Sequence, residues 1–125
     1  MTHDDVRTWL DAYVHAWRSY DPAAIADLFT KDATYAYHPW DGDEALVRGR
    51  DTIVADWLEV QDPPGSWEAQ YRPLVVEDDQ AVATGTTRYT GGKTYYNLWV
   101  LRFAEGDRCA EFVEWFMVPP SEESP

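Results

Sequence analysis

The sequence predicts an α+β fold in which helices come first and pack on one face of an antiparallel sheet. Two observations carry this prediction. Apolar residues recur at helical spacing over residues 2–60, whereas residues 67–118 form four apolar and aromatic runs that short polar turns separate. A chain of 125 residues suits one compact domain. We expect this domain to span residues 1–118 and residues 119–125 to form a flexible tail.

The first predicted helix begins at a capping box. Thr2 is followed three residues later by Asp5, which stands where this motif usually has Glu. Behind the box lies one apolar helical face that is about four turns long. This face consists of Val6, Trp9, Leu10, Tyr13, Val14 and Trp17.

A second helix is predicted from its cap. Asp21 is suited to cap a helix N-terminus, and Pro22 is suited to the first helical position. The helix is expected to end at the sequence KDAT, residues 31–34. Its apolar face would consist of Ile25, Leu28 and Phe29.

The first strand is predicted over Ala33–His38, where the chain leaves the sheet at a His-Pro pair. The polar loop WDGDEALVRG then leads to a third helix over Arg50–Val60, which the sequence QDPPG ends. The inward face of this helix would consist of Ile53, Val54, Trp57 and Leu58.

Four further strands are predicted to form an antiparallel meander: Trp67–Val76, Ala81–Tyr89, Thr94–Phe103 and Arg108–Val118. The third of them has apolar side chains on both faces. Leu98 and Val100 are expected on the face away from the helices, where a solvated sheet would have polar residues. A second copy of the chain most often covers such a face, so a homodimer is predicted. The inward face would hold Tyr95, Asn97, Trp99, Leu101 and Phe103.

The charge of the chain disfavours several classes of partner. A net charge of −13 argues against nucleic acid and against anionic membranes, which both attract basic surfaces. No apolar run approaches the ~20 residues of a membrane span. The start MTHDDVRTW lacks the pattern of a signal peptide. The lone Cys109 permits no internal disulfide, so we expect a cytoplasmic protein.

No cofactor and no metal site are predicted. The loop HPWDGDE offers hard ligands for a cation but lacks the regular ligand spacing of a calcium loop, so a solvated acidic turn is expected. These ligands would be His38, Asp41, Asp43 and Glu44.

Three stretches resemble the nuclear-transport-factor-2-like (NTF2-like) superfamily, in the style of its SnoaL-like and ketosteroid-isomerase-like branches. They are DPAAIADLFTKDATYAYHP, RGRDTIVADWL and YNLWVLRFAEGDRCAEFVEWF. The resemblance implies a cone-shaped curved antiparallel sheet wrapped around the N-terminal helices, a cystatin-like α+β barrel with a deep pocket. Many members dimerise through the outer sheet face. The superfamily hosts isomerases, cyclases, dehydratases and non-enzymes, so the fold alone does not choose among them.

The same resemblance implies three catalytic residues. Tyr13 matches a helix tyrosine that donates to the developing enolate in ketosteroid isomerases, and His38 stands where those enzymes have their base. Glu114 matches a carboxylate on the last strand that is the base in SnoaL-like cyclases. Trp99 replaces the second, acidic enolate donor, so steroid-type isomerisation is not expected. We expect His38 and Glu114 to face one cavity, close enough to interact directly or through one water.

The predicted substrate-binding residues are aromatic or amide side chains on inward-facing positions. Each of these side chains could instead be an ordinary core residue. The catalytic candidate Glu114 could instead be only the ion-pair partner of Arg88 or Arg102. The binding residues are Trp17, Tyr35, Trp57, Tyr89, Asn97, Trp99, Phe112 and Phe116.

Two functions stay open. The first is a small cofactor-free enzyme that performs acid–base chemistry on a small or medium apolar ligand bearing a carbonyl or hydroxyl. Isomerisation, cyclisation and dehydration all fit it. The second is a non-catalytic binder or accessory dimer of the same fold. An open cavity on which His38 and Glu114 converge would favour the enzyme.

Overall fold

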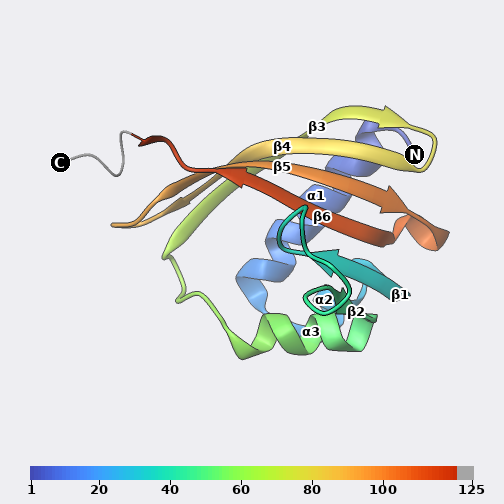
Figure 1. Cartoon of the computed structure of the whole chain (residues 1–125), viewed down its shortest axis with the longest axis horizontal. Coiled ribbons are helices and arrows are strands. Elements are labelled where there is room, and N and C mark those ends of the chain that lie inside the picture. The colour runs from blue at the N-terminus through green and yellow to red at the C-terminus, as the bar shows by residue number, and fades with distance from the viewer. Residues whose placement is uncertain (121–125) are drawn as a thin grey trace.

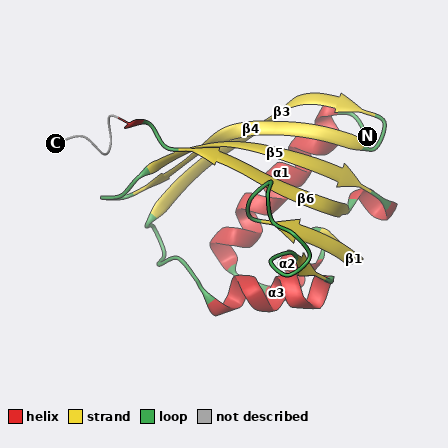
Figure 2. Ribbon diagram, in the orientation of Figure 1, coloured by secondary structure: helices red, strands yellow, loops and turns green. Residues whose placement is uncertain are grey.

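The computed structural model describes residues 1–120 and confirms the α+β class. Helices gather on one side of a curved, open, six-stranded sheet (Figure 1). The same separation into a helical layer and a strand layer is seen in Figure 2. The helices are α1 (His3–Ser19), α2 (Pro22–Ala26), α3 (Arg50–Glu59) and the short 3-10 helix η1 (Glu105–Asp107). The strands are β1 (Phe29–Ala36), β2 (Val47–Arg48), β3 (Trp67–Glu77), β4 (Gln80–Tyr89), β5 (Thr94–Phe103) and β6 (Cys109–Met117).

Helix α1 begins at the predicted capping box, which the structure confirms. The Thr2 hydroxyl accepts a hydrogen bond from the Asp5 amide at 3.1 Å, and the Asp5 carboxylate accepts one from the Thr2 amide at 2.9 Å. These bonds satisfy amides that a helix start otherwise leaves without partners. The side chains that α1 buries are Val6, Trp9, Leu10, Tyr13 and Ala16.

Helix α2 is shorter than predicted. Asp21 caps it as expected, with its carboxylate accepting from the Ala23 amide at 3.1 Å. The helix ends at Ala26, however, and does not reach residues 31–34. The apolar residues Leu28 and Phe29 continue its sequence pattern but lie beyond it, where the chain turns into the sheet.

Strand β1 begins four residues before the prediction, at Phe29, and ends two residues before it, at Ala36. Pairing with the last strand explains the early start. Phe29 lies opposite Cys109, and the Cys109 amide donates to the Leu28 carbonyl at 2.8 Å. This partner is far away in sequence, so the local pattern carries no signal for it.

The order of the sheet is β2-β1-β6-β5-β4-β3. The meander from β3 to β6 is antiparallel, as predicted. Strand β1 runs parallel to β6, so the whole sheet is mixed rather than antiparallel, and it does not close into a barrel. The predicted loop after β1 contains β2, in which Arg48 pairs with Thr34. A two-residue strand is held by its neighbour and has no periodicity of its own.

Leu98 and Val100 face away from the helices, as predicted, and are 36% and 41% exposed. In the register of β5 and β6, Trp115 lies opposite Leu98 and Met117 lies opposite Tyr96. We call Tyr96, Leu98, Val100, Trp115 and Met117 the outer apolar patch.

No helix in residues 1–120 is both long enough and apolar enough to cross a membrane. Of the predicted tail, residues 121–125 lie outside the described residues.

Candidate functional site

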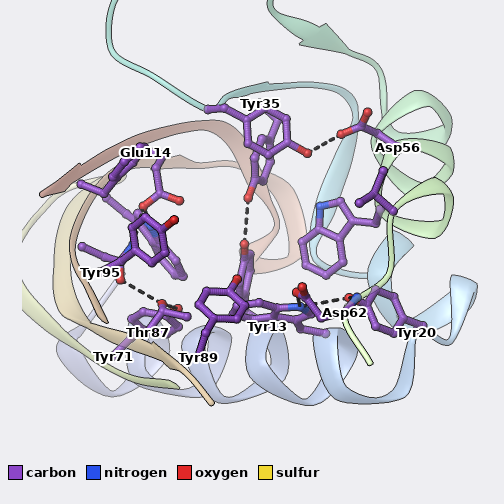
Figure 3. Close-up of a pocket in the computed structure, with 17 residues that line it drawn as sticks. Tyr13, Tyr20, Tyr35, Asp56, Asp62, Tyr71, Thr87, Tyr89, Tyr95 and Glu114 are labelled. Atoms are coloured by element: carbon purple, nitrogen blue, oxygen red, sulfur yellow. Dashed lines mark hydrogen bonds between the residues drawn. The ribbon is translucent and has the colours of Figure 1, made fainter. Parts of the chain in front are cut away.

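A cavity of about 580 Å³ lies between the helices and the concave face of the sheet (Figure 3). Every long strand of the meander contributes to its wall, as do β1, α1 and α3. Eleven of the 17 lining residues are aromatic: Tyr13, Trp17, Tyr20, Tyr35, Tyr37, Trp57, Tyr71, Tyr89, Tyr95, Trp99 and Phe116. The others are Asp56, Val60, Asp62, Thr87, Asn97 and Glu114.

Glu114 lies on the inner face of β6, so the strand register inferred from the sequence is confirmed. Its partner across the sheet is Trp99 on β5. One carboxylate oxygen, Oε2, accepts from the indole Nε1 of Trp99 at 2.6 Å and from the amide Nδ2 of Asn97 at 2.8 Å. No donor within residues 1–120 binds the other oxygen, Oε1. Glu114 therefore contacts the cavity with one oxygen held and one available.

Burial raises the pKa of Glu114 above its ordinary value, because the charged form loses hydration. The hydrogen bonds from Asn97 and Trp99 and the nearby His38 oppose this rise, since each favours the carboxylate. Neither Arg88 nor Arg102 pairs with Glu114; the Arg102 guanidinium donates to Glu111 instead, at 3.1 Å. Such a carboxylate binds a proton more readily than an exposed one, which suits a general base.

A chain of hydrogen bonds across four strands, β3 to β6, ends at Glu114. Asn97 donates through its amide nitrogen, so its Oδ1 is free to accept from the Thr87 hydroxyl at 2.9 Å. The single Thr87 proton is then used, and Thr87 accepts from the hydroxyl of Tyr71. All donors in this chain point toward Glu114, which holds its side chain in one orientation.

Tyr13 and Tyr35 form a second polar pair, with 2.8 Å between their hydroxyl oxygens (Figure 3). Burial raises the pKa of both tyrosines well above the ordinary value, so both stay neutral. Two hydroxyls carry two protons, and their mutual bond uses one. One proton therefore remains for a ligand oxygen or for water.

Phe112, a predicted substrate-binding residue, is fully buried and does not line the cavity. Its ring stacks on Tyr13, with centroids 5.7 Å apart, and on Tyr35, with centroids 4.2 Å apart. Phe112 thus supports the tyrosine pair from behind. The seven other predicted binding residues all line the cavity.

His38 does not line the cavity, so the expected direct meeting with Glu114 is not found. Its ring stacks on Trp40, with centroids 4.8 Å apart, and its Nδ1 lies 3.3 Å from the Asp41 carboxylate. Phe116, which does line the cavity, lies 5.7 Å from the His38 ring centroid. His38 is therefore at the rim, behind Phe116. It still affects Glu114 through its charge.

Two carboxylates of the acidic loop HPWDGDE are bound by neighbouring residues. Asp41 accepts from the backbone amide of His38, and Asp43 pairs with Arg48 at 2.8 Å. Within residues 1–120, no three His, Cys, Asp or Glu side chains are grouped so that they could hold a metal ion.

Sequence reasoning missed two carboxylates in the cavity wall. Asp56 accepts a hydrogen bond from the Tyr37 hydroxyl, and Asp62 accepts one from the Trp17 indole at 3.1 Å. The amide of Asp62 also donates to the Tyr20 hydroxyl at 2.8 Å. Asp56 lies one residue before the inward-facing Trp57, which was the available signal. Asp62 lies in the helix-breaking sequence, where no signal exists.

Comparison with known proteins agrees with this architecture. Residues 10–115 match the SnoaL-like domain family. An NTF-2 like protein of unknown function from Burkholderia xenovorans LB400 is 21% identical, with a TM-score of 0.71 over 93% of this chain and 85% of that chain.

Two further solved structures have the same fold. A protein of unknown function with a cystatin-like fold from Methylobium petroleophilum PM1 is 18% identical, with a TM-score of 0.72 over 95% of this chain and 80% of that chain. An NTF-2 like protein of unknown function from Silicibacter pomeroyi DSS-3 is 18% identical, with a TM-score of 0.62 over 94% and 100%. No curated protein matches the chain. The family match shows that the chain belongs to the SnoaL-like domain family, and its open curved sheet has the fold of the NTF-2 like structures.

Proposed function

We propose that the chain is an acid–base enzyme of the isomerase, cyclase or dehydratase type. Its ligand would be a small or medium apolar molecule that bears a carbonyl or hydroxyl. The observation that carries the proposal is Glu114, a half-buried carboxylate with one oxygen fixed by two N–H donors and the other available in an aromatic cavity. An apolar environment raises the pKa of a carboxylate toward neutral pH, and a fixed orientation positions it to accept a proton, as a general base requires.

The proposed mechanism uses two groups. Glu114 removes a proton from a carbon next to the ligand carbonyl, or from a ligand hydroxyl. Tyr13 uses the free proton of the Tyr13–Tyr35 pair to donate to the oxygen on which negative charge develops. The same carboxyl group can then return the proton at a second position, which completes an isomerisation or an elimination.

The proposal can be tested without knowing the natural ligand. The neutral probe 5-nitrobenzisoxazole opens when a base removes its ring C–H proton. The electron pair of that bond forms a nitrile, the N–O bond breaks, and a coloured phenolate leaves. We expect saturable turnover by the wild-type protein, rising with pH through the raised pKa of Glu114. Probe binding without turnover would contradict the enzyme and would favour the non-catalytic binder of the same fold.

Replacement of Tyr13 and Tyr35 should separate a ligand contact from a supporting role. Tyr13→Phe removes the proposed oxyanion donor, and we expect kcat on the probe to fall by about tenfold or more. Tyr35→Phe should cost less, because it acts only by orienting Tyr13. The double variant should then be no slower than Tyr13→Phe alone. A double variant whose loss is the product of the two single losses would contradict this arrangement.

Replacement of His38 should move a pH profile rather than abolish activity. His38 favours the charged form of Glu114, so His38→Ala should raise the pKa of Glu114 further. The acid limb of kcat/KM then moves to higher pH, while the plateau above it is unchanged. The exposed His15→Ala on α1 is the control. A loss of kcat at every pH would instead indicate that His38 is itself the base.

We further propose that the chain forms a homodimer through the outer apolar patch. Monomeric soluble proteins rarely expose large contiguous apolar surfaces. Five neighbouring side chains of β5 and β6 are each at least 36% exposed here: Tyr96, Leu98, Val100, Trp115 and Met117. A symmetric pairing of the two sheets would bury this patch on both copies at once.

The dimer predicts a mass near twice the 14.4 kDa of one chain in sedimentation experiments. Val100→Lys should shift the protein to monomer, because burial of an unpaired ammonium costs several kcal/mol. Ala55→Lys is the matched control, since it adds the same charge at an exposed position of α3. A wild-type monomer at high protein concentration would refute the pairing.

A further inference from the structure

The charges of the cavity wall all have one sign. Asp56, Asp62 and Glu114 line it, and none of its 17 lining residues is Lys, Arg or His. His38 lies at the rim outside this set, and the whole chain carries a net charge of −13. Such a site attracts cations and repels anions before any specific contact forms.

The three carboxylates keep acceptor capacity for a ligand. Asp56 accepts from Tyr37 through Oδ2, and Asp62 accepts from Trp17 through Oδ2. No donor and no cation within residues 1–120 binds the Oδ1 of either aspartate, and the same holds for Oε1 of Glu114. Carboxylates that leave water are usually paired, and no Lys, Arg or His among the described residues forms an ion pair with these three.

The aromatic rings of the wall favour the same kind of ligand. The face of an aromatic ring is negative and attracts ammonium groups, most strongly when water is excluded. In the wall, Trp57 follows Asp56 on α3, and Trp17 and Tyr20 contact Asp62 directly. Rings and carboxylates thus occur together at this part of the cavity.

The carboxylates are divided between two sides of the cavity. Figure 3 shows Glu114 on the side of the sheet, whereas Asp56 and Asp62 lie on the side of α3 and Tyr20. The proton chemistry assigned to Glu114 and the Tyr13–Tyr35 pair therefore leaves the α3 side free for another part of the ligand.

We propose that the α3 side of the cavity is an ammonium subsite. Asp56 and Asp62 supply the negative charge, and Trp17, Trp57 and Tyr20 supply the aromatic faces. The proposal refines the proposed function, from which it takes the shared cavity: the ligand of this protein carries a protonated amine or quaternary ammonium group beside its apolar body. It also excludes carboxylate and phosphate ligands, for which this wall offers no cation.

Three probes of one shape test the charge preference. They are 3-phenylpropylammonium, 3-phenylpropan-1-ol and 3-phenylpropanoate, with binding followed by calorimetry and by the fluorescence of the cavity tryptophans. We expect the ammonium probe to bind at least about tenfold more tightly than the alcohol, and the carboxylate to bind weakest. Equal binding of ammonium and alcohol, or tighter binding of the carboxylate, would overturn the proposal.

Charge-neutral variants locate the subsite. Asp56→Asn and Asp62→Asn keep an oxygen that accepts from Tyr37 or Trp17 but remove the charge. Each should weaken the ammonium probe several-fold and leave the alcohol unchanged, whereas the exposed Asp51→Asn on α3 should change neither. Unchanged ammonium binding in both cavity variants would refute the subsite.

These outcomes are independent of catalysis. A protein that fails to open 5-nitrobenzisoxazole but prefers the ammonium probe would lack the proposed enzyme function and retain the cation subsite. A protein that turns over the neutral probe but shows no ammonium preference would have the proposed enzyme function and lack the cation subsite.

Discussion

Glu114→Gln is expected to lower kcat on 5-nitrobenzisoxazole, and on the natural substrate, by about 100-fold or more. Glutamine has nearly the same shape, and its carbonyl oxygen can still accept from Asn97 and Trp99. Its amide group takes the place of the available oxygen and cannot accept a proton. The fold should survive, because the cavity wall keeps its volume and its two hydrogen bonds.

The matched control for this variant is Glu111→Gln on the same strand. Glu111 is exposed and pairs with Arg102 outside the cavity, so its loss should leave kcat unchanged. Full activity of Glu114→Gln would refute the assignment of the base. Equal losses in both variants would indicate a general effect of β6 rather than proton transfer.

The same variant should change stability in a pH-dependent way. The pKa of Glu114 is raised in the folded state, so the folded protein binds this proton more tightly than the unfolded chain. The wild type therefore loses stability as pH rises from about 4.3, the unfolded value, through the folded pKa. Glu114→Gln lacks this loss. Its free energy of unfolding in urea should exceed that of the wild type at neutral pH, and the difference should vanish below pH ~4.

Gly85→Ala is expected to destabilise the fold by about 3 kcal/mol, the upper end of what an overpacked site costs. A Cβ atom on Gly85 would lie 2.0 Å from the Gln70 carbonyl oxygen and 2.8 Å from the Tyr71 Cα. Both are backbone atoms of the paired strand β3, so no side-chain rotation relieves the contact. Tyr71 lines the cavity, and its displacement would also break the hydrogen-bond chain to Glu114.

Urea unfolding of Gly85→Ala measures this effect, with Gly42→Ala as the control. A Cβ atom on Gly42 meets nothing within 4 Å, so that substitution should change the free energy of unfolding little. Equal stability of the two variants would show that β3 and β4 can separate at Gly85 at little cost.

Elements with strong local signals were predictable from the sequence. The Thr2–Asp5 capping box begins α1 where expected, and β5 has its predicted bounds, Thr94–Phe103. Amphipathic periodicity and capping depend on residues a few positions apart, so they are visible in a short window. Alternation along the last strand likewise placed Glu114 on the inner face, together with its neighbours on β5.

Pairings between distant segments were decided only by the tertiary structure. The early start of β1 at Phe29, the short β2 and the parallel pairing of β1 with β6 depend on partners up to about 80 residues away, which no local pattern records. Contacts between distant segments also explain why His38 lies at the rim of the cavity and not in its wall. Its position after the first strand matched the family pattern, but the packing of Phe116 and the bond to Asp41 leave it at the rim.

The candidate site divides in the same way. The sequence by itself determined that β5 and β6 present Asn97, Trp99 and Glu114 to one side, because side chains alternate strictly along a strand. Only the tertiary structure brought Asp56 and Asp62 to the opposite wall. These two residues come from a helix and from a loop, and their distance to β6 is set by how α3 packs beside β1, not by any spacing along the chain.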